Sequence, residues 1–251
     1  MADVIDFKIL GDDMQLVEIE LDPGEGVRAE AGAMMYMQPG IQMQTGMDGG
    51  LFSGFKRMFT GESFFITTFL NQAPGKSQVA FGAPYPGKII PLDVGEQGGE
   101  FLCQKDAFLA AARGIDIEVA FTKKLGAGLF GGEGFILQRL QGDGMAFIHA
   151  GGTIVKRYLI PGQSLRVDTG CLVAFAPSVQ YDIEFVGGFK NALFGGEGLF
   201  LTTLTGPGEV YLQSLPFSRL ADRIHAAARF KNVGEVRGNS GFLGNVLRGD
   251  K

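Results

Sequence analysis

Apolar residues gather in short runs with strand-like composition, and each run is bounded by a turn rich in Gly and Pro. The first runs cover residues 65–69, 136–140 and 200–204. After a turn, second runs follow at residues 78–81, 145–148 and 210–212. Two β-prone runs on either side of such a turn are typical of a β-hairpin. The pattern predicts three hairpins and a mainly β fold.

The apolar spacing changes after residue 216. Phe217, Leu220, Ile224 and Ala228 fall on one stripe, with charged residues elsewhere. This spacing predicts one amphipathic C-terminal helix at about 217–230. We expect the helix to pack as a plug over an end or an edge of the β body. Residues 231–251 are a Gly-rich basic tail.

One eight-residue motif occurs three times, at residues 58–65, 129–136 and 193–200, and its glutamates are Glu62, Glu133 and Glu197. A second motif recurs upstream, at residues 21–25, 92–96 and 159–163. Self-similarity of this kind outranks local propensity. It predicts three internal repeats, near 14–85, 86–151 and 152–214, in one domain spanning residues 1–230.

A unit of about 65 residues cannot easily bury both faces of its own strands, whereas three units together can. We therefore expect a β-sandwich or double-stranded β-helix-like body with pseudo-threefold symmetry. Residues 107–113 look helical by propensity. Because they align with the apolar segments at 33–34 and 171–172, the repeat predicts a strand there.

Composition supports a folded protein. The 251 residues include 40 Gly and 10 Pro, about a fifth of the chain, and the hydrophobic fraction is 45%. The longest apolar runs fall far short of the roughly 20 residues of a membrane helix. The acidic start lacks the basic region of a secretory signal. These features predict a cytoplasmic protein, with peripheral membrane contact left open.

The net charge is −5 and is unevenly divided, because residues 217–251 carry a net charge of +4 and residues 1–216 a net charge of −9. An acidic body disfavours nucleic acid as a partner. The basic end could bind a partner chain or an anionic surface, although a solvated end is the simpler interpretation. Cys103 and Cys171 do not form a disulfide framework, and we expect both to be small buried apolar residues.

The three Gly-Glu-Gly-type motifs, together with Gly-Pro-Gly-Glu-Val-Tyr-Leu-Gln-Ser at 206–214, resemble the bacterial branch of the altered-inheritance-of-mitochondria family. The resemblance covers residues 5–230. It implies a fold similar to the tryptophan RNA-binding attenuation protein, and a role in membrane or organelle organisation for the mitochondrial members. This fold and the need to cover β edges together predict a homo-oligomer. The resemblance carries over no catalytic residue.

Three chemical signals are weak. Residues 126–131 satisfy G-x-G-x-x-G, but a β-prone run follows where a dinucleotide site needs a helix. The two histidines, His149 and His225, are not clustered with other ligands, so structural or surface roles are favoured. No G-x-S-x-G marks a nucleophile, although Ser-His-Asp catalysis is not excluded by sequence order. We assign no catalytic, cofactor-binding or metal-binding residue.

The repeated glutamates Glu62, Glu133 and Glu197 would occupy equivalent corners of a threefold body. Three converging carboxylates could bind a cation. Alternatively, each carboxylate accepts hydrogen bonds from backbone N–H groups at a Gly-rich corner, and this structural interpretation is favoured.

Cations and bulky apolar residues precede these glutamates in each repeat. The cations are Lys56, Arg57, Lys123, Lys124 and Lys190. Loops of this composition suit an anionic lipid surface. The alternative is that the apolar residues pack into the body while the lysines are solvated.

These observations favour a non-enzymatic scaffold or binding protein that acts through surface loops at a membrane surface or with protein partners. The alternative is a metal- or small-molecule-dependent enzyme with a site between repeats. RNA binding by analogy with the fold is the third hypothesis, which the acidic charge weakens.

Overall fold

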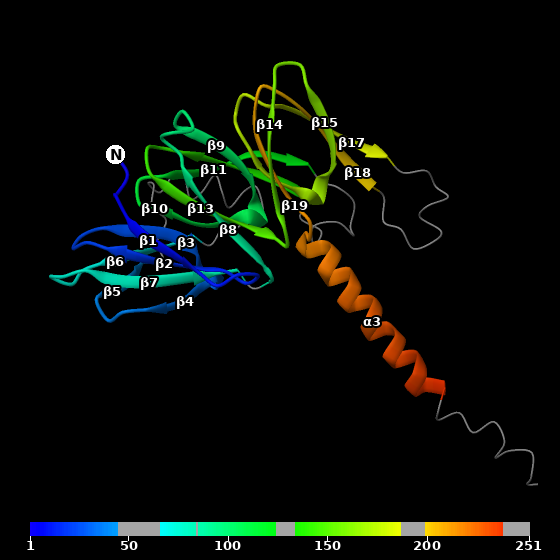
Figure 1. Ribbon diagram of the computed structural model, residues 1–251. Coiled ribbons are helices and arrows are strands. Elements are labelled where there is room, and N and C mark those ends of the chain that lie inside the picture. Colours follow the sequence, from blue (N-terminus) through cyan, green and yellow to red (C-terminus); the bar gives the residue numbers. More distant parts are fainter. Residues whose placement is uncertain (45–65, 84, 124–133, 187–198, 238–251) are drawn as a thin grey trace, which may run out of the picture. The chain divides into compact units, whose positions relative to one another are not determined.

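The chain is described as a computed structural model that covers residues 1–44, 66–83, 85–123, 134–186 and 199–237. It divides into two compact units, residues 1–216 and 217–251 (Figure 1). The first unit is built from β-strands, and the second contains the helix α3, Phe217–Arg237. The predicted fold class, mainly β with a C-terminal helix, is confirmed.

Strands of the described residues form four sheets, in which neighbouring strands pair antiparallel. The first sheet has the order β1 (Asp6–Leu10), β2 (Leu16–Leu21), β7 (Ser77–Gly82), β4 (Met34–Met37). The second has the order β5 (Ile41–Gln44), β6 (Ile66–Asn71), β3 (Gly26–Glu30), β10 (Phe108–Ala112), β13 (Met145–Gly151), β8 (Gly87–Asp93).

The third sheet has the order β11 (Asp116–Lys123), β12 (Phe135–Gln141), β9 (Glu100–Gln104), β16 (Leu172–Phe175), β19 (Gly208–Gln213), β14 (Ile154–Leu159). The fourth has the order β15 (Ser164–Asp168), β18 (Leu199–Thr205), β17 (Gln180–Val186).

Strands differ in how many of their faces are buried. In β2, Val17, Ile19 and Leu21 are fully buried while the residues between them are not. This alternation is the period of a strand with one face in the core. By contrast β10, with the sequence Phe-Leu-Ala-Ala-Ala, is buried at every position. The predicted strand within residues 107–113 is therefore confirmed, because burial on both faces overrides the helical preference of alanine.

The three predicted hairpins are wrong. The strands β6 and β7 flank the first turn, but β6 belongs to the second sheet and β7 to the first. The same holds for β12 with β13 and for β18 with β19, which lie in different sheets. Each turn therefore carries the chain from one layer to another. A strand that is buried on both faces hydrogen-bonds to other strands of its own sheet. The local sequence pattern does not specify which strands those are.

Besides β1 with β2, three further pairs of consecutive strands bond to each other, namely β5 with β6, β11 with β12, and β17 with β18. The connections between them contain residues 45–65, 124–133 and 187–198, which lie outside the described residues. The repeated motif falls in or across the end of each connection.

Three short 3-10 turns stand at matching points of the chain: Ala31–Ala33 between β3 and β4, Lys105–Ala107 between β9 and β10, and Thr169–Cys171 between β15 and β16. The strand after each turn has a register shift close to its start. Such a shift inserts an extra residue and bends the strand. The count of three repeats stays a prediction, and these recurring elements support it.

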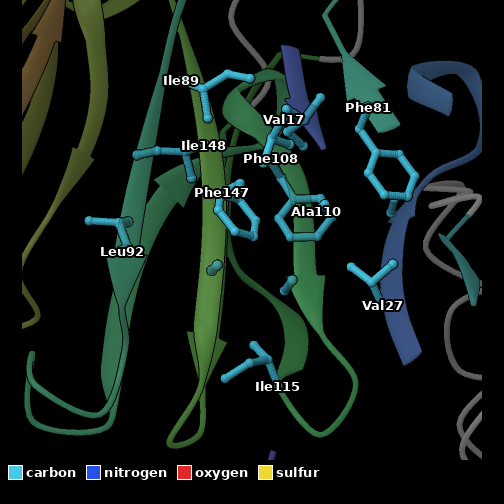
Figure 2. Close-up of a cluster of buried hydrophobic side chains, with 14 of the residues drawn as sticks. Val17, Val27, Phe81, Ile89, Leu92, Phe108, Ala110, Ile115, Phe147 and Ile148 are labelled. Atoms are coloured by element: carbon cyan, nitrogen blue, oxygen red, sulfur yellow. The ribbon is translucent and has the colours of Figure 1, made fainter. Parts of the chain in front are cut away.

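A large buried cluster joins the first three sheets of the body. In Figure 2, Val17 and Phe81 from the first sheet lie beside Phe108 and Phe147 from the second. Phe7 of β1 also meets Phe147 edge to face, with ring centroids 4.9 Å apart. A second cluster joins the third sheet to the fourth and includes Phe175. Close packing between successive layers of this kind forms a sandwich.

The helix α3 runs to Arg237, beyond the expected end near residue 230. On its predicted apolar stripe, Phe217 and Ile224 are 50% and 61% exposed. The packing of this helix as a plug stays a prediction. Among the described residues, no helix combines the length and apolar character needed to cross a membrane.

Candidate functional site

The residues singled out in the repeats lie outside the described part of the chain. These are Glu62, Glu133 and Glu197, together with the cations Lys56, Arg57, Lys124 and Lys190. Lys123 is the last residue of β11, where its backbone lies opposite Phe135, but its side chain is not described. A cation site at the glutamates and a lipid contact at the cations both stay predictions.

His149 lies in the core of the body, on β13. Its side chain is 2% exposed, and its ring packs edge to face against Tyr85 with centroids 4.6 Å apart. The Nδ1 atom is buried and has no hydrogen-bond partner. Burial lowers the pKa of this imidazole to about 4. His149 is thus a neutral structural residue at pH 7, as its sequence context favoured.

Cys103 on β9 is fully buried, Cys171 is partly exposed, and neither cysteine forms a disulfide. Burial raises the pKa of the Cys103 thiol to about 12. A protonated thiol is a weak nucleophile and a poor metal ligand. The expectation of a small buried apolar residue therefore holds for Cys103, whereas Cys171 is less buried than expected.

A different surface, missed by sequence reasoning, lies along β4. Its residues Met35, Tyr36 and Met37 are 55%, 43% and 38% exposed, although β4 carries no charged or proline residue. Natural edge strands are usually protected by charge, proline or a cover. The strand β4 is the last strand of the first sheet. We name Met35, Tyr36 and Met37 the β4 edge surface.

Contacts with the rest of the first sheet fix the β4 edge surface. Tyr36 donates a hydrogen bond of 2.5 Å to the Glu18 carboxylate on β2, which raises the pKa of the phenol. The Met35 side chain lies over Gly82, since a Cβ built on that glycine would come within 2.8 Å of the sulfur. These contacts hold large, partly exposed apolar side chains on the last described strand of the first sheet.

Charged residues elsewhere on the first sheet form a network. The Lys76 ammonium lies 2.9 Å from Glu20, 3.3 Å from Asp6 and 3.7 Å from Asp22. The hydrogen bond from Lys76 lowers the pKa of the Glu20 carboxyl. Exposed pairs of this kind contribute little stability. Within the described ranges, no three His, Cys, Asp or Glu side chains are grouped so that they could hold a metal ion.

These features define a class of protein: a sandwich of antiparallel sheets whose candidate site is an apolar strand edge. Residues 7–215 match the family described as Mitochondrial biogenesis AIM24, and the chain belongs to that family. This finding confirms the family resemblance.

Two relatives are similar to this chain over most of its length. An uncharacterised protein of Streptococcus pyogenes serotype M6 is 31% identical over 214 residues, which are 82% of this chain and 84% of the relative. A crystal structure of a protein from Streptococcus pyogenes, determined in structural genomics, has a TM-score of 0.73 and 28% identity. This match covers 89% of this chain and 99% of that protein.

Proposed function

We propose that this protein is a non-enzymatic scaffold, which works by binding other macromolecules along the β4 edge surface. The β4 edge surface is the observation that carries the proposal, because it presents three large, partly exposed apolar side chains on the last strand of the first sheet within the described residues. Strand addition to such an edge combines main-chain hydrogen bonds with side-chain specificity. Apolar groups that gather on a surface mark binding sites.

Reactive side chains of the described body support a binding role rather than a chemical one. The His149 imidazole and the Cys103 thiol are both buried, and burial favours the neutral form of each. A general base or a nucleophile has to reach its substrate. Neither buried side chain does so, and the Cys103 thiol is also held in its protonated, weakly nucleophilic form.

A pull-down tests the binding role. The immobilised wild-type chain and two variants are compared for the macromolecules that they retain from solution, among which is a second copy of the chain with a different tag. The test variant carries Met35→Ser and Met37→Ser. The matched control is Met43→Ser, since Met43 is also an exposed methionine on an edge strand, 40% exposed on β5. We expect the double variant to lose a retained macromolecule that the control keeps. Equal retention by all three proteins would overturn the proposal.

Flotation with neutral and anionic vesicles separates a membrane partner from a protein partner. The variant for this test changes Lys56, Arg57, Lys123, Lys124 and Lys190 to Ser. Flotation of the wild type with anionic vesicles alone, lost in this variant, would place the scaffold at a membrane surface. If the wild type stays at the bottom of both gradients, the membrane partner is rejected and a protein partner is the remaining alternative.

Elemental analysis tests the non-enzymatic part of the proposal. Copurification of one metal ion per chain, lost when Glu62, Glu133 and Glu197 are changed to Gln, would favour the metal-dependent enzyme instead.

A further inference from the structure

We infer that β14, the last strand of the third sheet, is a second binding site of this protein, which takes an extended acidic segment of another protein. The segment carries two adjacent carboxylates followed by an apolar residue, and it pairs antiparallel with β14 to add a strand to the sheet. The site lies on a different sheet from the β4 edge surface, so the inference goes beyond the proposed function. Its support is the backbone, the exposed side chains and the charge of β14.

The strands β2 and β14 occupy the same place in their sheets. In β2, Val17 lies opposite Phe81, the residue where the register between β7 and β4 shifts. In β14, Val155 lies opposite Leu212, where the register between β19 and β16 shifts in the same way. The outer side of β2 is covered by β1, which pairs antiparallel with it. The outer side of β14 has no paired strand within the described residues (Figure 1).

The third comparable strand is β8, and its outer edge is closed by other means. Gly87 donates a backbone hydrogen bond to Asp13 and accepts one from Gln15. The N–H of Ile89 donates to the side-chain oxygen of Gln15 at 2.8 Å. Alternate residues of a strand direct their backbone groups to the same side, so the next outward residue is Pro91, which has no N–H to offer. The edge of β8 is thus closed at these three positions.

The backbone of β14 meets no such partner. Ile90 of β8 lies opposite Ile148, where the register between β13 and β10 shifts, so Ile90 corresponds to Val155. The outward residues of β14 are therefore Ile154, Lys156 and Tyr158. Within the described ranges, these residues make no backbone hydrogen bond outside the β14–β19 ladder. Lys156 thus presents a backbone N–H at the position where β8 has a proline.

Apolar side chains are exposed along the same strand. Val155 and Tyr158 are 36% and 63% exposed, and Ile160, just beyond the end of β14, is 60% exposed. Val17, the residue of β2 that is equivalent to Val155, is fully buried. Apolar groups that gather on a surface mark a binding site. A strand added to β14 covers part of this surface.

Charge on β14 selects an acidic partner. Lys156 and Arg157 are both exposed. Lys156 forms an ion pair of 2.8 Å with Glu209, whereas no carboxylate of the described residues pairs with Arg157. In the first sheet, β1 places Lys8 opposite Glu18, the equivalent of Lys156, so the charge at this position is reversed in β14. The same two cations disfavour pairing of β14 with β14 of a second copy.

The pairing of β1 with β2 gives the register of the added strand. Ile9 of β1 lies opposite Val17, and the same register places an apolar residue of the added segment opposite Val155. The two preceding residues of the segment then lie opposite Lys156 and Arg157. Cross-strand pairs of opposite charge stabilise a sheet, and like charges destabilise it. The expected segment therefore reads acidic, acidic, apolar in chain direction, and main-chain hydrogen bonds complete the contact.

Peptide titration tests the chemistry of the partner. Fluorescence anisotropy compares two peptides, Val-Glu-Glu-Val-Leu and Val-Lys-Lys-Val-Leu, each flanked by Gly-Ser for solubility. We expect the wild-type chain to bind the acidic peptide about tenfold more tightly. Arg157→Glu should remove this preference, whereas Arg223→Glu, which makes the same change in net charge at an exposed position of α3, should keep it. Equal binding of both peptides by the wild type would overturn the inference.

Two substitutions of Lys156 separate strand addition from attraction by charge alone. Lys156→Pro removes the outward N–H at the position where β8 has Pro91, so the β14–β19 ladder keeps its hydrogen bonds. Lys156→Ala removes the same charge but keeps the N–H. We expect the alanine variant to weaken binding of the acidic peptide by about threefold and the proline variant to abolish it. Equal binding by the two variants, with equal melting temperatures, would overturn the inference.

Hydrogen exchange of the wild-type chain locates the peptide without any variant. The N–H of Lys156 should exchange quickly in the free chain and become protected by the acidic peptide. The N–H of Arg157, which points to β19, should be protected in both states. A Lys156 N–H that is already protected in the free chain would overturn the inference, because the edge would then be occupied. Protection confined to β4 would also overturn it, while supporting the proposed function.

Discussion

Tyr85 and His149 meet edge to face inside the body, with their ring centroids 4.6 Å apart and their planes at 88°. The contact places an ionisable imidazole where water does not solvate it, because His149 is 2% exposed. The charged form of a buried group is disfavoured unless it gains a partner. The folded protein therefore disfavours the protonated form of His149.

The first prediction is that the free energy of unfolding falls between about pH 6.5 and pH 4. The pKa of His149 is lowered from 6.5 to about 4 in the folded chain by burial. Below pH 6.5 the unfolded chain binds a proton that the folded chain does not bind, so stability falls with pH. The free energy of unfolding falls by about 3 kcal/mol in total because of this shift in pKa. Urea denaturation at a series of pH values measures it.

Two variants isolate this contribution. His149→Leu keeps a side chain of similar volume and should flatten the slope in this pH range. His225→Asn should leave the slope unchanged, since His225 is exposed on α3. A slope that persists in His149→Leu would assign the pH dependence to other groups.

The second prediction concerns Gly87, which makes room for the same histidine. A Cβ at Gly87 would lie 2.2 Å from the backbone oxygen of Ala150 and 2.4 Å from Nε2 of His149. A backbone atom cannot move aside without distorting the β8–β13 ladder. We expect Gly87→Ala to destabilise the fold by about 3 kcal/mol or more.

Gly75→Ala is the matched control for Gly87→Ala. A Cβ at Gly75 meets nothing within 4 Å. This variant should change stability by less than about 0.5 kcal/mol. Thermal unfolding of both variants checks the pair, and equal melting temperatures would contradict the steric argument.

The strands are largely predictable from sequence, because their apolar runs and turns recur at regular spacing. Residues 107–113 show how much the recurrence adds: composition favours a helix, yet the alignment with other copies predicts the strand that β10 forms. Local patterning could not predict the sheets. It places β6 and β7 next to each other in sequence, but it carries no information on which layer receives each strand.

The β4 edge surface could not be found from sequence for a related reason. The run Met34–Met37 is apolar like its counterparts β10 and β16, so it reads as a core strand. It becomes a surface because β4 is the last strand of its sheet in the described part of the chain, which is a property of topology rather than of composition. The cations near each motif are visible in the sequence, whereas this apolar edge depends on the order of the strands in the sheet.

The third prediction concerns Asn71, a fully buried polar residue at the turn that leads from the second sheet to the first. Its Nδ2 donates to the backbone oxygens of Leu21 at 2.8 Å and Gly75 at 2.9 Å. Its Oδ1 accepts a hydrogen bond of 3.0 Å from the backbone N–H of Ala73. One side chain thus satisfies three backbone groups at the point where the chain changes layers.

Asn71→Ala should destabilise the fold by about 3 kcal/mol, because a buried group that loses its partner costs its full desolvation. The neighbouring Gln72→Ala is the control, since Gln72 is exposed and its backbone N–H, which the substitution keeps, donates a hydrogen bond to the backbone oxygen of Gly40. Urea denaturation of both variants measures the difference. If Asn71→Ala were as stable as Gln72→Ala, the side-chain hydrogen bonds would not hold this layer-crossing turn, and the short connection itself would have to do so.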